Sequence, residues 1–377
     1  MVVRAPILIM TSTERHEQRY QRRKAQRQER RWKKYRRCDN FDCVFSYGNL
    51  YRAYMECRRG VSWKGSVQSL ISEAPLRINK IYHSLYDGTF RSKGFVSFDI
   101  CERGKQRHIR SIDLDTRIVQ RCLCNNSLVP VLTRKFIYDN GAAIRGKGYT
   151  FAVNRVVHHL RQYYRAYGTD GYILLFDFSK FFDSISHGLL KSIIQHEYSD
   201  DRIVNLLSYF IDEFGDVGIG LGSQISQILA LAAADRLDHT IKEKLHIRYY
   251  GRYMDDGYLI HSSKSVLIRC LGVLKRLCSE LGIIINWKKT QIIKLSHGFT
   301  FLKVRFNVTR SGKIIRRVNR RSVNTMKHKL RSLSTSVSLD DITTSFNSWS
   351  GYMRHFNAHR TYLNMLQLYR WINLSYT

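Results

Sequence analysis

The sequence places aspartates at the ends of two β-rich runs, and this pattern constrains the fold more than any other feature of the chain. Residues 172–178 read YILLFDF, an apolar strand that carries Asp177 at its C-terminal end. Residues 247–261 read IRYYGRYMDDGYLIH, two β-rich runs on either side of Met254-Asp255-Asp256-Gly257, as in a hairpin. If the two strands are neighbours in a sheet, Asp177 and Asp255 point into the same cleft.

This arrangement of carboxylates favours one kind of chemistry over an ordinary Asp-rich turn, which is the simpler interpretation of residues 253–256 taken alone. Carboxylate oxygens are the ligands that Mg²⁺ prefers, and Asp177 and Asp255 on neighbouring strands would jointly hold two such ions. Two ions held in this way activate a hydroxyl and stabilise a leaving pyrophosphate. The spacing therefore favours phosphoryl transfer on a nucleotide over a hydrolase dyad.

The charge balance predicts a polyanionic partner. Lys and Arg number 63 against 30 Asp and Glu, which gives a formal charge of +33. Nucleic acid is the first candidate and an anionic membrane surface the second. Hydrophobic residues make up 44% of the chain, which excludes global disorder. The absence of an apolar run long enough to span a membrane and of a signal-peptide pattern predicts a cytoplasmic protein.

The most basic segment is residues 14–37, in which half of the residues are Lys or Arg. It lacks Gly and Pro, so it is able to form a helix once its charge is neutralised. A solubilising tail is one interpretation. We favour a nucleic-acid-binding arm, because Tyr20, Trp32 and Tyr35 are interleaved with the charges and aromatic rings stack on bases.

Local patterns predict the remaining elements. Alternation over 94–112 indicates two strands around an Arg103-Gly104 turn, and a helix is expected from about Thr150 to Tyr167, ending at Gly168. Further expected elements are a helix at 223–244, a helix at 264–281, a strand at 283–286, a hairpin around 291–306 and basic helices from 318 onward.

Four motifs occur in an order that resembles the palm of reverse transcriptases: FDFSKFFDSISH (176–187), GLGSQISQ (220–227), YMDD (253–256) and NWKKT (286–290). The likeness is to the bacterial lineage of group II introns, diversity-generating retroelements and orphan enzymes associated with defence. It implies an α+β, right-hand polymerase fold with a small antiparallel palm sheet and a short helical thumb. The implied divisions are a basic arm at 1–40, fingers at 41–165, a palm at 166–300, and the primer grip and thumb at 301–377.

The resemblance also assigns roles to residues. It makes Asp177 and Asp255 direct ligands of Mg²⁺ (Mn²⁺ is an alternative), places Asp256 in support, and adds Phe178 to the metal-binding set. Lys289 matches the lysine that protonates the leaving pyrophosphate; an exposed lysine on a turn is the simpler interpretation. The catalytic residues implied are therefore Asp177, Asp255, Asp256 and Lys289.

The resemblance assigns nucleotide binding to five residues: Lys105, Arg107, Phe182, Gly222 and Gln227. Lys105 and Arg107 match cations that bind the incoming triphosphate, and a solvated basic strand is the simpler alternative. Phe182 matches the steric gate against a ribose 2′-hydroxyl, with a core phenylalanine as the alternative. Ser223, beside Gly222, also suits a helix N-cap.

Nucleic-acid contacts are expected from Arg145 and Lys147 and, in the arm, from Arg22, Arg23, Arg30, Arg31 and Trp32. Phe301-Leu302 resembles the primer grip, but Lys303 stands where the family usually has Gly. No Cys/His cluster accompanies these motifs to hold an HNH endonuclease domain, and there is no room after the thumb for that domain or for an RNase H domain with its own carboxylates, so neither is expected.

The motif that ends in Ser226-Gln227 resembles diversity-generating retroelement enzymes, whereas group II introns and retrons usually have Ser-Pro there. The sequence therefore predicts a reverse transcriptase that makes cDNA from a dedicated structured RNA, with dNTPs as substrates. An antiviral defence enzyme acting with a non-coding RNA is the alternative role. A non-catalytic, maturase-like RNA-binding protein and a basic RNA chaperone are rivals of another class. An accessory protein or a homo-oligomer is a further conceivable partner, and no membrane is expected.

Overall fold

The computed structural model describes residues 11–61, 63, 65–102, 105–220, 222–333 and 339–374. The chain forms two compact units. The first comprises 1–134, 191–213 and 221–225, and the second comprises 135–190, 214–220 and 226–377. Helices and small antiparallel sheets are combined, so the expected α+β class is confirmed. The division into arm, fingers, palm and thumb stays a prediction.

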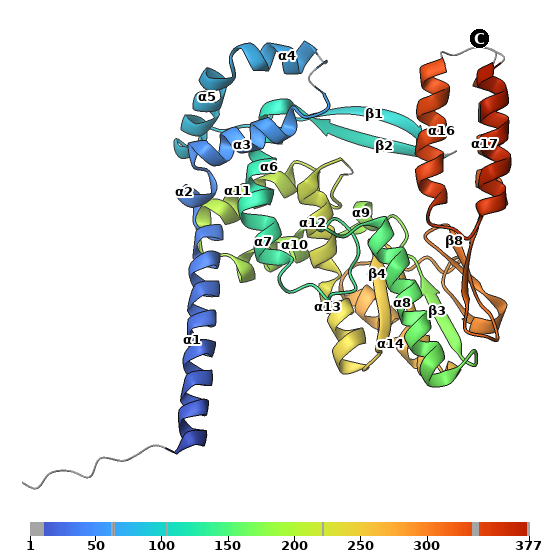
Figure 1. Cartoon of the computed structure of the whole chain (residues 1–377). Helices are drawn as coiled ribbons and strands as arrows, with labels where there is room; N and C mark the ends of the chain where they lie inside the picture. The colour runs from blue at the N-terminus through green and yellow to red at the C-terminus, as the bar shows by residue number, and fades with distance from the viewer. Residues whose placement is uncertain are drawn as a thin grey trace, which may run out of the picture. The chain divides into compact units, whose positions relative to one another are not determined.

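The first unit is mainly helical (Figure 1). Its helices are α1 (Ser12–Cys38), α2 (Phe41–Val44), α3 (Tyr47–Cys57), α4 (Gly65–Ser72), α5 (Ala74–Tyr86), α6 (Leu114–Leu123), α7 (Val129–Leu132), α11 (Asp201–Asp212) and most of α10 (His187–Glu197). A π-helical turn, Cys124–Leu128, joins α6 to α7. Apolar side chains spaced on one face of α3, α6 and α11 supply its core, among them Leu50, Ile118 and Leu207.

A two-stranded ribbon completes this unit. The strands β1 (Phe95–Glu102) and β2 (Lys105–Ile112) pair antiparallel, with Phe95 opposite Ile112. They occupy the positions predicted from the alternating pattern. The expected turn at Arg103 and Gly104 lies outside the described residues.

The second unit is built on a four-stranded antiparallel sheet in the order β4-β5-β3-β6. Its strands are β3 (Tyr172–Phe176), β4 (Tyr249–Tyr253), β5 (Asp256–His261) and β6 (Gln291–Lys294). The central strand β3 is apolar at nearly every position because both of its faces are covered. The helices α8 (Tyr149–Tyr167) and α14 (Lys264–Glu280) pack against the sheet (Figure 1).

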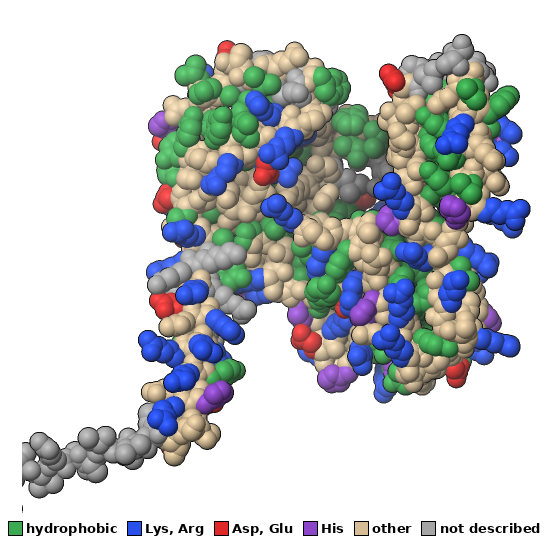
Figure 2. Space-filling model, in the orientation of Figure 1, with side chains coloured by type: hydrophobic (Ala, Val, Ile, Leu, Met, Phe, Trp, Pro, Cys, Tyr) green, Lys and Arg blue, Asp and Glu red, His purple; other side chains and the backbone are tan. Residues whose placement is uncertain are grey.

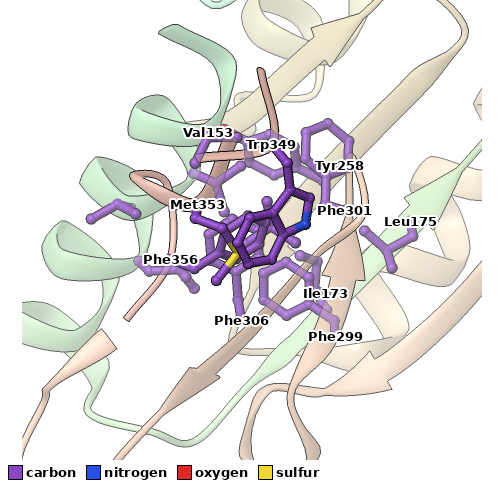
Figure 3. Close-up of a cluster of buried hydrophobic side chains, with 14 of the residues drawn as sticks. Val153, Ile173, Leu175, Tyr258, Phe299, Phe301, Phe306, Trp349, Met353 and Phe356 are labelled. Carbon is purple, nitrogen blue, oxygen red and sulfur yellow. The ribbon is translucent and has the colours of Figure 1, made fainter. Parts of the chain in front are cut away.

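The rest of this unit comprises α9 (Phe181–Ser184), most of α12 (Gln224–Ala233), α13 (Asp235–His239), a π-helical turn (Thr240–Lys244), a 3-10 turn (Leu295–His297), β7 (Phe299–Phe301), β8 (Val304–Val308), β9 (Ile314–Val318), α15 (Arg320–Leu333), α16 (Leu339–Met353) and α17 (His359–Leu374). Residues of β7, β8 and the last three helices share a core with the sheet. Figure 3 shows Ile173 and Leu175 of β3 in one cluster with Phe306 of β8 and Trp349 of α16. The C-terminal helices are therefore packed on the same apolar core as β3.

Three local expectations prove wrong. Residues 283–286 form no strand, only an isolated bridge between Phe178 and Ile285. The hairpin expected around 291–306 does not form as a single unit. Instead β6 pairs with β3, with Leu174 opposite Ile292, and β7 pairs with β8. The helix expected over 223–244 is interrupted at Ala234, whose backbone (φ −96°, ψ 3°) is not helical. In the part of the chain that the structure describes, no helix has the length and hydropathy that a membrane span requires.

Candidate active site

Three carboxylates converge where β3 ends and the β4–β5 hairpin turns. Asp177 follows the last residue of β3, and the pairing of Phe176 with Gly257 sets it beside the hairpin. Asp255 lies in the two-residue turn between β4 and β5, and Asp256 is the first residue of β5. The backbone N–H of Phe178 donates to the carbonyl of Asp255 at 3.2 Å. The expectation that Asp177 and Asp255 come from neighbouring strands is met by β3 and β5.

The turn at 286–290 adds a lysine to this cluster. Asp177 is buried (3% exposed), and its carboxylate accepts hydrogen bonds from Asn286 Nδ2 at 2.9 Å and Lys289 Nζ at 2.5 Å. The backbone N–H of Asn286 also donates to the carbonyl of Asp177, at 2.8 Å. Asn286 therefore fixes the turn that presents Lys289. Partial burial lowers the pKa of Lys289, but the hydrogen bond to Asp177 and the charges of Asp177, Asp256 and Asp255 raise it by more. The net pKa is therefore raised, and Lys289 stays protonated.

The cluster carries more negative charge than Lys289 neutralises. Burial raises the pKa of Asp256 to about 7, and the charges of Asp255 and Asp177 add to the rise. Among the described residues, no group of His, Cys, Asp and Glu is arranged as a ready-made metal site. The three side chains nevertheless offer hard oxygen ligands, and a divalent cation would relieve their mutual repulsion. They therefore fit Mg²⁺ in charge and in chemistry.

The neighbouring aromatic residues divide into core and partly exposed positions. Phe178 is buried (2% exposed), with its ring centroid 5.4 Å from that of Phe176 and 5.2 Å from that of Phe181. Phe182 is only half-buried, and its carbonyl accepts a hydrogen bond from the N–H of Ile219 at 2.8 Å. A half-buried ring suits a surface that contacts a substrate better than it suits a core position. Its role as a gate stays a prediction.

The predicted nucleotide-binding residues are divided between the two units. Lys105, Arg107 and Gly222 belong to the first, whereas Gln227 and the carboxylates belong to the second. The strand that carries Lys105 and Arg107 is described, but their side chains lie outside the described residues. Gln227 is exposed on α12. The structure thus brings together Asp177, Asp255, Asp256 and Lys289, all of which belong to the second unit.

Gly222 meets a steric requirement that the sequence alone did not specify. Its φ is 119°, and an added Cβ would lie 3.0 Å from the carbonyl oxygen of Arg110, so a side chain would be strained by the backbone conformation and crowded against that oxygen. The next residue, Ser223, donates to Gln120 Oε1 at 2.7 Å and accepts from the N–H of Ile225 at 3.2 Å. This contact at the start of α12 agrees with the N-cap interpretation of Ser223. A cavity of about 210 Å³ adjoins the loop, lined by Ile112, Arg117, Gln120, Arg121, Gly222, Ser223 and Gln224.

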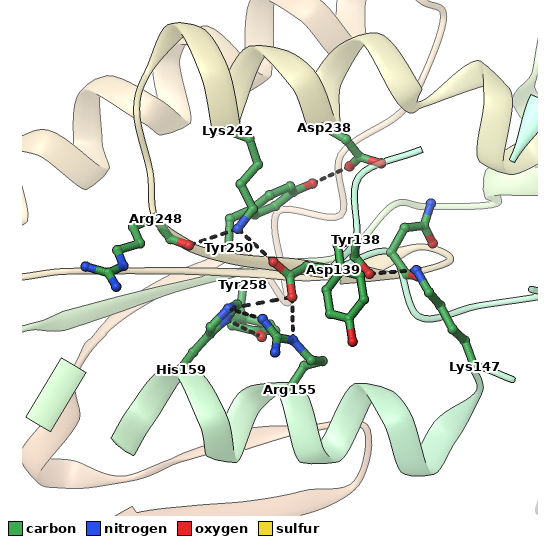
Figure 4. Close-up of polar contacts among 11 residues, drawn as sticks. Tyr138, Asp139, Lys147, Arg155, His159, Asp238, Lys242, Arg248, Tyr250 and Tyr258 are labelled. Atoms are coloured by element: carbon green, nitrogen blue, oxygen red, sulfur yellow. Dashed lines mark hydrogen bonds and ion pairs between the residues drawn. The ribbon is translucent and has the colours of Figure 1, made fainter. Parts of the chain in front are cut away.

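The two predicted basic residues near position 146 differ in their surroundings. Lys147 Nζ donates to the carbonyls of Tyr138 at 2.6 Å and Asn140 at 3.1 Å, as Figure 4 shows for the loop 138–147. Burial lowers the pKa of Lys147. Arg145 is exposed. Lys147 therefore organises its own loop, and Arg145 is the better placed of the two for a nucleic-acid contact.

The basic arm is a helix, as expected from its composition. A capping box at Thr11 and Glu14 begins α1, since Glu14 N–H donates to Thr11 Oγ1 and Thr11 N–H donates to the Glu14 carboxylate. Figure 2 shows Lys and Arg side chains along the helix. Arg22, Arg23 and Arg30 are exposed. The side chains of Arg31 and Trp32 lie outside the described residues.

Asn286 and Arg252 are site residues that the sequence analysis did not assign. Asn286 holds Asp177, and its signal was its place at the start of the NWKKT motif. Arg252 is buried in β4 (1% exposed), two residues before the turn. Its signal was a cation inside a β-rich run that otherwise reads as a core strand.

Comparison with known proteins identifies one family. Residues 93–306, more than half of the chain, match the family model described as reverse transcriptase (RNA-dependent DNA polymerase). No curated protein matches the sequence.

Solved structures that align with this chain include two telomerases from Candida species. Telomerase from Candida albicans, in complex with a fragment of telomeric RNA, aligns with a TM-score of 0.47 and 11% identity, over 74% of this chain and 57% of that chain. Apo telomerase from Candida tropicalis aligns with a TM-score of 0.47 and 14% identity, over 75% of this chain and 62% of that chain. The chain thus spans less than two thirds of the length of either telomerase.

Proposed function

The chain belongs to the reverse transcriptase family of RNA-dependent DNA polymerases, and from that premise we propose that it copies a dedicated structured RNA into cDNA. The observation that carries the proposal is the convergence of Asp177, Asp255 and Asp256 at the end of β3 and the β4–β5 turn. A binding protein or chaperone has no use for three clustered carboxylates. A polymerase needs them to hold cations.

In this proposal Asp177 and Asp255 are the direct ligands of two Mg²⁺ ions, with Asp256 and Phe178 completing the set. The ions supply positive charge that activates the primer 3′-hydroxyl and stabilises the leaving pyrophosphate. Lys289 is held at Asp177 in its protonated form. It is therefore placed to give the proton on Nζ to the pyrophosphate as that group leaves.

Substrate selection is assigned to residues around this centre. Phe182 excludes a ribose 2′-hydroxyl by its bulk, and Lys105 and Arg107 bind the triphosphate. Gly222 and Gln227 contact the nascent base pair. The exposed cations Arg22, Arg23, Arg30 and Arg145, with Arg31, Trp32 and Lys147, contact the nucleic-acid backbone or bases.

The biological setting we propose is a diversity-generating retroelement, on the Ser226-Gln227 ending of the motif that begins at Gly220. A defence-associated enzyme that acts with a non-coding RNA is the alternative, and sequencing the RNA and cDNA that copurify with the protein separates the two. A maturase-like protein without catalysis is the rival of another class. Partners would be the RNA template, the cDNA and dNTPs, with an accessory protein or a second copy of the chain as further candidates.

The first prediction tests the catalytic proposal with Asp255→Asn. An amide cannot supply the charge that balances Mg²⁺, so dNTP incorporation on an RNA template should be abolished while RNA binding and folding are retained. The measurement is primer extension, with circular dichroism and RNA binding in parallel. The matched control is Asp170→Asn, the same change at an exposed position just before the other end of β3. Incorporation by Asp255→Asn within a few-fold of wild type would contradict the proposal.

A further inference from the structure

Arg252 is a fully buried cation next to the carboxylate cluster. Its side chain and that of its partner Asp238 on α13 are both 0% exposed. The pair is bidentate, with Nε donating to Oδ1 at 2.8 Å and Nη2 to Oδ2 at 2.6 Å. Tyr250 donates to the same carboxylate at 2.5 Å, a contact drawn in Figure 4. Asp238 therefore fixes the guanidinium plane.

The third nitrogen of this guanidinium reaches the turn that carries Asp255. Arg252 Nη1 donates to the carbonyl of Met254 at 2.8 Å. Met254 has φ +54°, a left-handed conformation that a side-chain-bearing residue rarely adopts. On the other side of the turn, the carbonyl of Asp255 accepts from Phe178 N–H at 3.2 Å. These two hydrogen bonds hold the turn in a conformation that Met254 alone disfavours.

The backbone of Arg252 is fixed as well. Its N–H donates to the carbonyl of Asp139 at 3.1 Å, and its own carbonyl accepts from Gly141 N–H at 2.9 Å. The loop 138–147 thus pairs with the edge of β4 at this residue. Both the guanidinium and the backbone of Arg252 are therefore held in place. The hydrogen bond from Nη1 then constrains the position of the Met254 carbonyl in the turn.

We propose that Arg252 is a positioning residue, which sets the Met254–Asp255 turn so that the Asp255 carboxylate meets its cation. The inference rests on the proposed function of Asp255 as a metal ligand. Arg252 touches neither substrate nor cation and acts through the Met254 carbonyl. Arginine is required because separate nitrogens of one rigid plane serve Asp238 and Met254 at once, whereas a lysine has a single nitrogen.

The test is Arg252→Lys in steady-state primer extension on an RNA template. We expect kcat to fall by about tenfold or more, the factor that a charge-assisted hydrogen bond is able to supply, with KM for dNTP little changed. The Mg²⁺ concentration for half-maximal activity should rise. The matched control is Arg77→Lys, the same change in the bidentate pair of Arg77 with Asp115 (2.7 and 3.0 Å), which belongs to the first unit. It should lower stability without changing the Mg²⁺ requirement.

Two substitutions of Met254 separate positioning from general damage. Glycine adopts positive φ without strain, so Met254→Gly should shrink the loss caused by Arg252→Lys to a few-fold. Met254→Ala keeps a Cβ and therefore the strain, so the full loss should remain. Equal losses in all three backgrounds would overturn the proposal.

A second variant covers the case in which Arg252→Lys fails to fold. Arg252→Met with Asp238→Leu replaces the ion pair by apolar residues of similar volume, a change that buried pairs often tolerate. It removes the bond to Met254 and should reproduce the kcat and Mg²⁺ defects. Wild-type protein without any incorporation would refute the proposed function. An active wild type with an equally active Arg252→Lys or double variant would refute only the role of Arg252.

Discussion

Phe181 and Phe182 are adjacent in sequence but differ in exposure. Phe181 is 4% exposed, whereas Phe182 is half-buried. If Phe182 is the gate, Phe182→Ala should selectively increase ribonucleotide incorporation, because a gate acts through bulk. The measurement is the ratio of kcat/KM for dNTP and rNTP in primer extension.

The control for this prediction is Phe181→Leu. It shortens a buried ring and should lower the free energy of unfolding by about 1–3 kcal/mol, as core changes of this size do, without altering the dNTP/rNTP ratio. An unchanged ratio in Phe182→Ala would return Phe182 to a structural role.

His159 is a buried residue whose protonation the fold resists. Burial lowers its pKa to about 3, with Lys242 and Arg155 adding to the effect and Asp139 opposing it. Arg155 Nη2 lies 3.1 Å from Nε2, and because arginine only donates, Nε2 accepts and the ring is neutral. The other nitrogen, Nδ1, then donates to the Tyr258 hydroxyl at 2.9 Å, as Figure 4 shows. Protonating His159 would therefore break the contact with Arg155.

This arrangement predicts a loss of stability in mild acid. The unfolded chain binds a proton at His159 near pH 6.5 and the folded chain only near pH 3, so the free energy of unfolding falls as pH drops through that window. Between pH 7.5 and 5.5 the contribution is about 1 kcal/mol. His159→Gln should lose that much less than wild type over the same interval in urea denaturation. His297→Gln, at an exposed ring, is the control. Identical pH dependence in wild type and His159→Gln would show that His159 is not the group responsible.

At the scale of elements, the β7–β8 hairpin shows how the chain accommodates an unfavourable turn. Phe301 pairs with Val304, which leaves a two-residue turn of Leu302 and Lys303 with φ of +48° and +64°. Two positive φ values are typical of a type I′ turn, which favours Asn and Gly. The lysine that stands at position 303 in place of the usual Gly therefore does not prevent the β7–β8 hairpin from forming.

The strain in this turn gives a prediction of its own. Lys303→Gly should relieve roughly 1–2 kcal/mol of left-handed strain, against about 0.5–1 kcal/mol lost to the greater freedom of the unfolded chain. The free energy of unfolding should therefore rise slightly, by about 0.5 kcal/mol, in chemical denaturation. Thr300→Gly in β7, where no positive φ is required, should lower it. A destabilised Lys303→Gly would mean that the lysine side chain outweighs the turn strain.

The elements that the sequence predicted well depend on local signals. The helix α8 ends at Tyr167, and Gly168 follows with φ +66° and ψ −140°, a backbone conformation that glycine adopts without strain. The hairpin at β4 and β5 followed from its two β-rich runs. The prediction of a strand at 283–286 was wrong because a short run of three isoleucines is compatible with an irregular segment as well as with a strand. In the structure, Ser179 N–H donates to the Ile284 carbonyl at 2.7 Å, but regular strand pairing does not continue beyond it.

The site was predictable to the extent that its signals were local. An apolar strand that ends in Asp177 and a hairpin with two aspartates place the carboxylates without knowledge of the fold. The contacts of Asp177 with Asn286 and Lys289 join residues 109 and 112 positions apart, and no periodicity encodes them. The same holds for Arg252, whose burial is intelligible only once Asp238 is known to face it.

At the scale of the whole molecule, the net charge of +33 favours a polyanionic partner, and α1 is the segment with the highest density of Lys and Arg. The C-terminal end of α1 is fixed to the first unit, because Ser127 Oγ donates to the Cys38 carbonyl at 2.7 Å and Arg134 lies over the Tyr35 ring at 4.3 Å. Asp39, just beyond, accepts from the N–H of Ser199 at 2.9 Å. The arm is thus a basic helix anchored at one end, a suitable shape for binding along an RNA backbone.

The arm should contribute to RNA affinity mainly through phosphate neutralisation. Each phosphate neutralised releases a condensed counterion and adds about 0.7 to the slope of log affinity against log salt for single strands. Deleting residues 1–37 should therefore weaken RNA binding and flatten its salt dependence. Incorporation on a short preformed primer–template at high enzyme concentration should be spared, because Asp177, Asp255 and Lys289 lie outside the arm.

Point variants separate charge from the loss of a helix. Arg22→Gln, Arg23→Gln and Lys24→Gln together should reduce the slope by about 2, that is 0.7 for each cation that contacts a phosphate. The matched control neutralises three exposed cations of α14: Arg269→Gln, Lys275→Gln and Arg276→Gln. Its net charge changes equally, so a general charge effect predicts the same loss in both triple variants. A specific arm predicts the loss in the first variant alone. Dissociation constants measured at several salt concentrations decide, and coincident lines for wild type, deletion and arm variant would leave α1 as a solubilising tail.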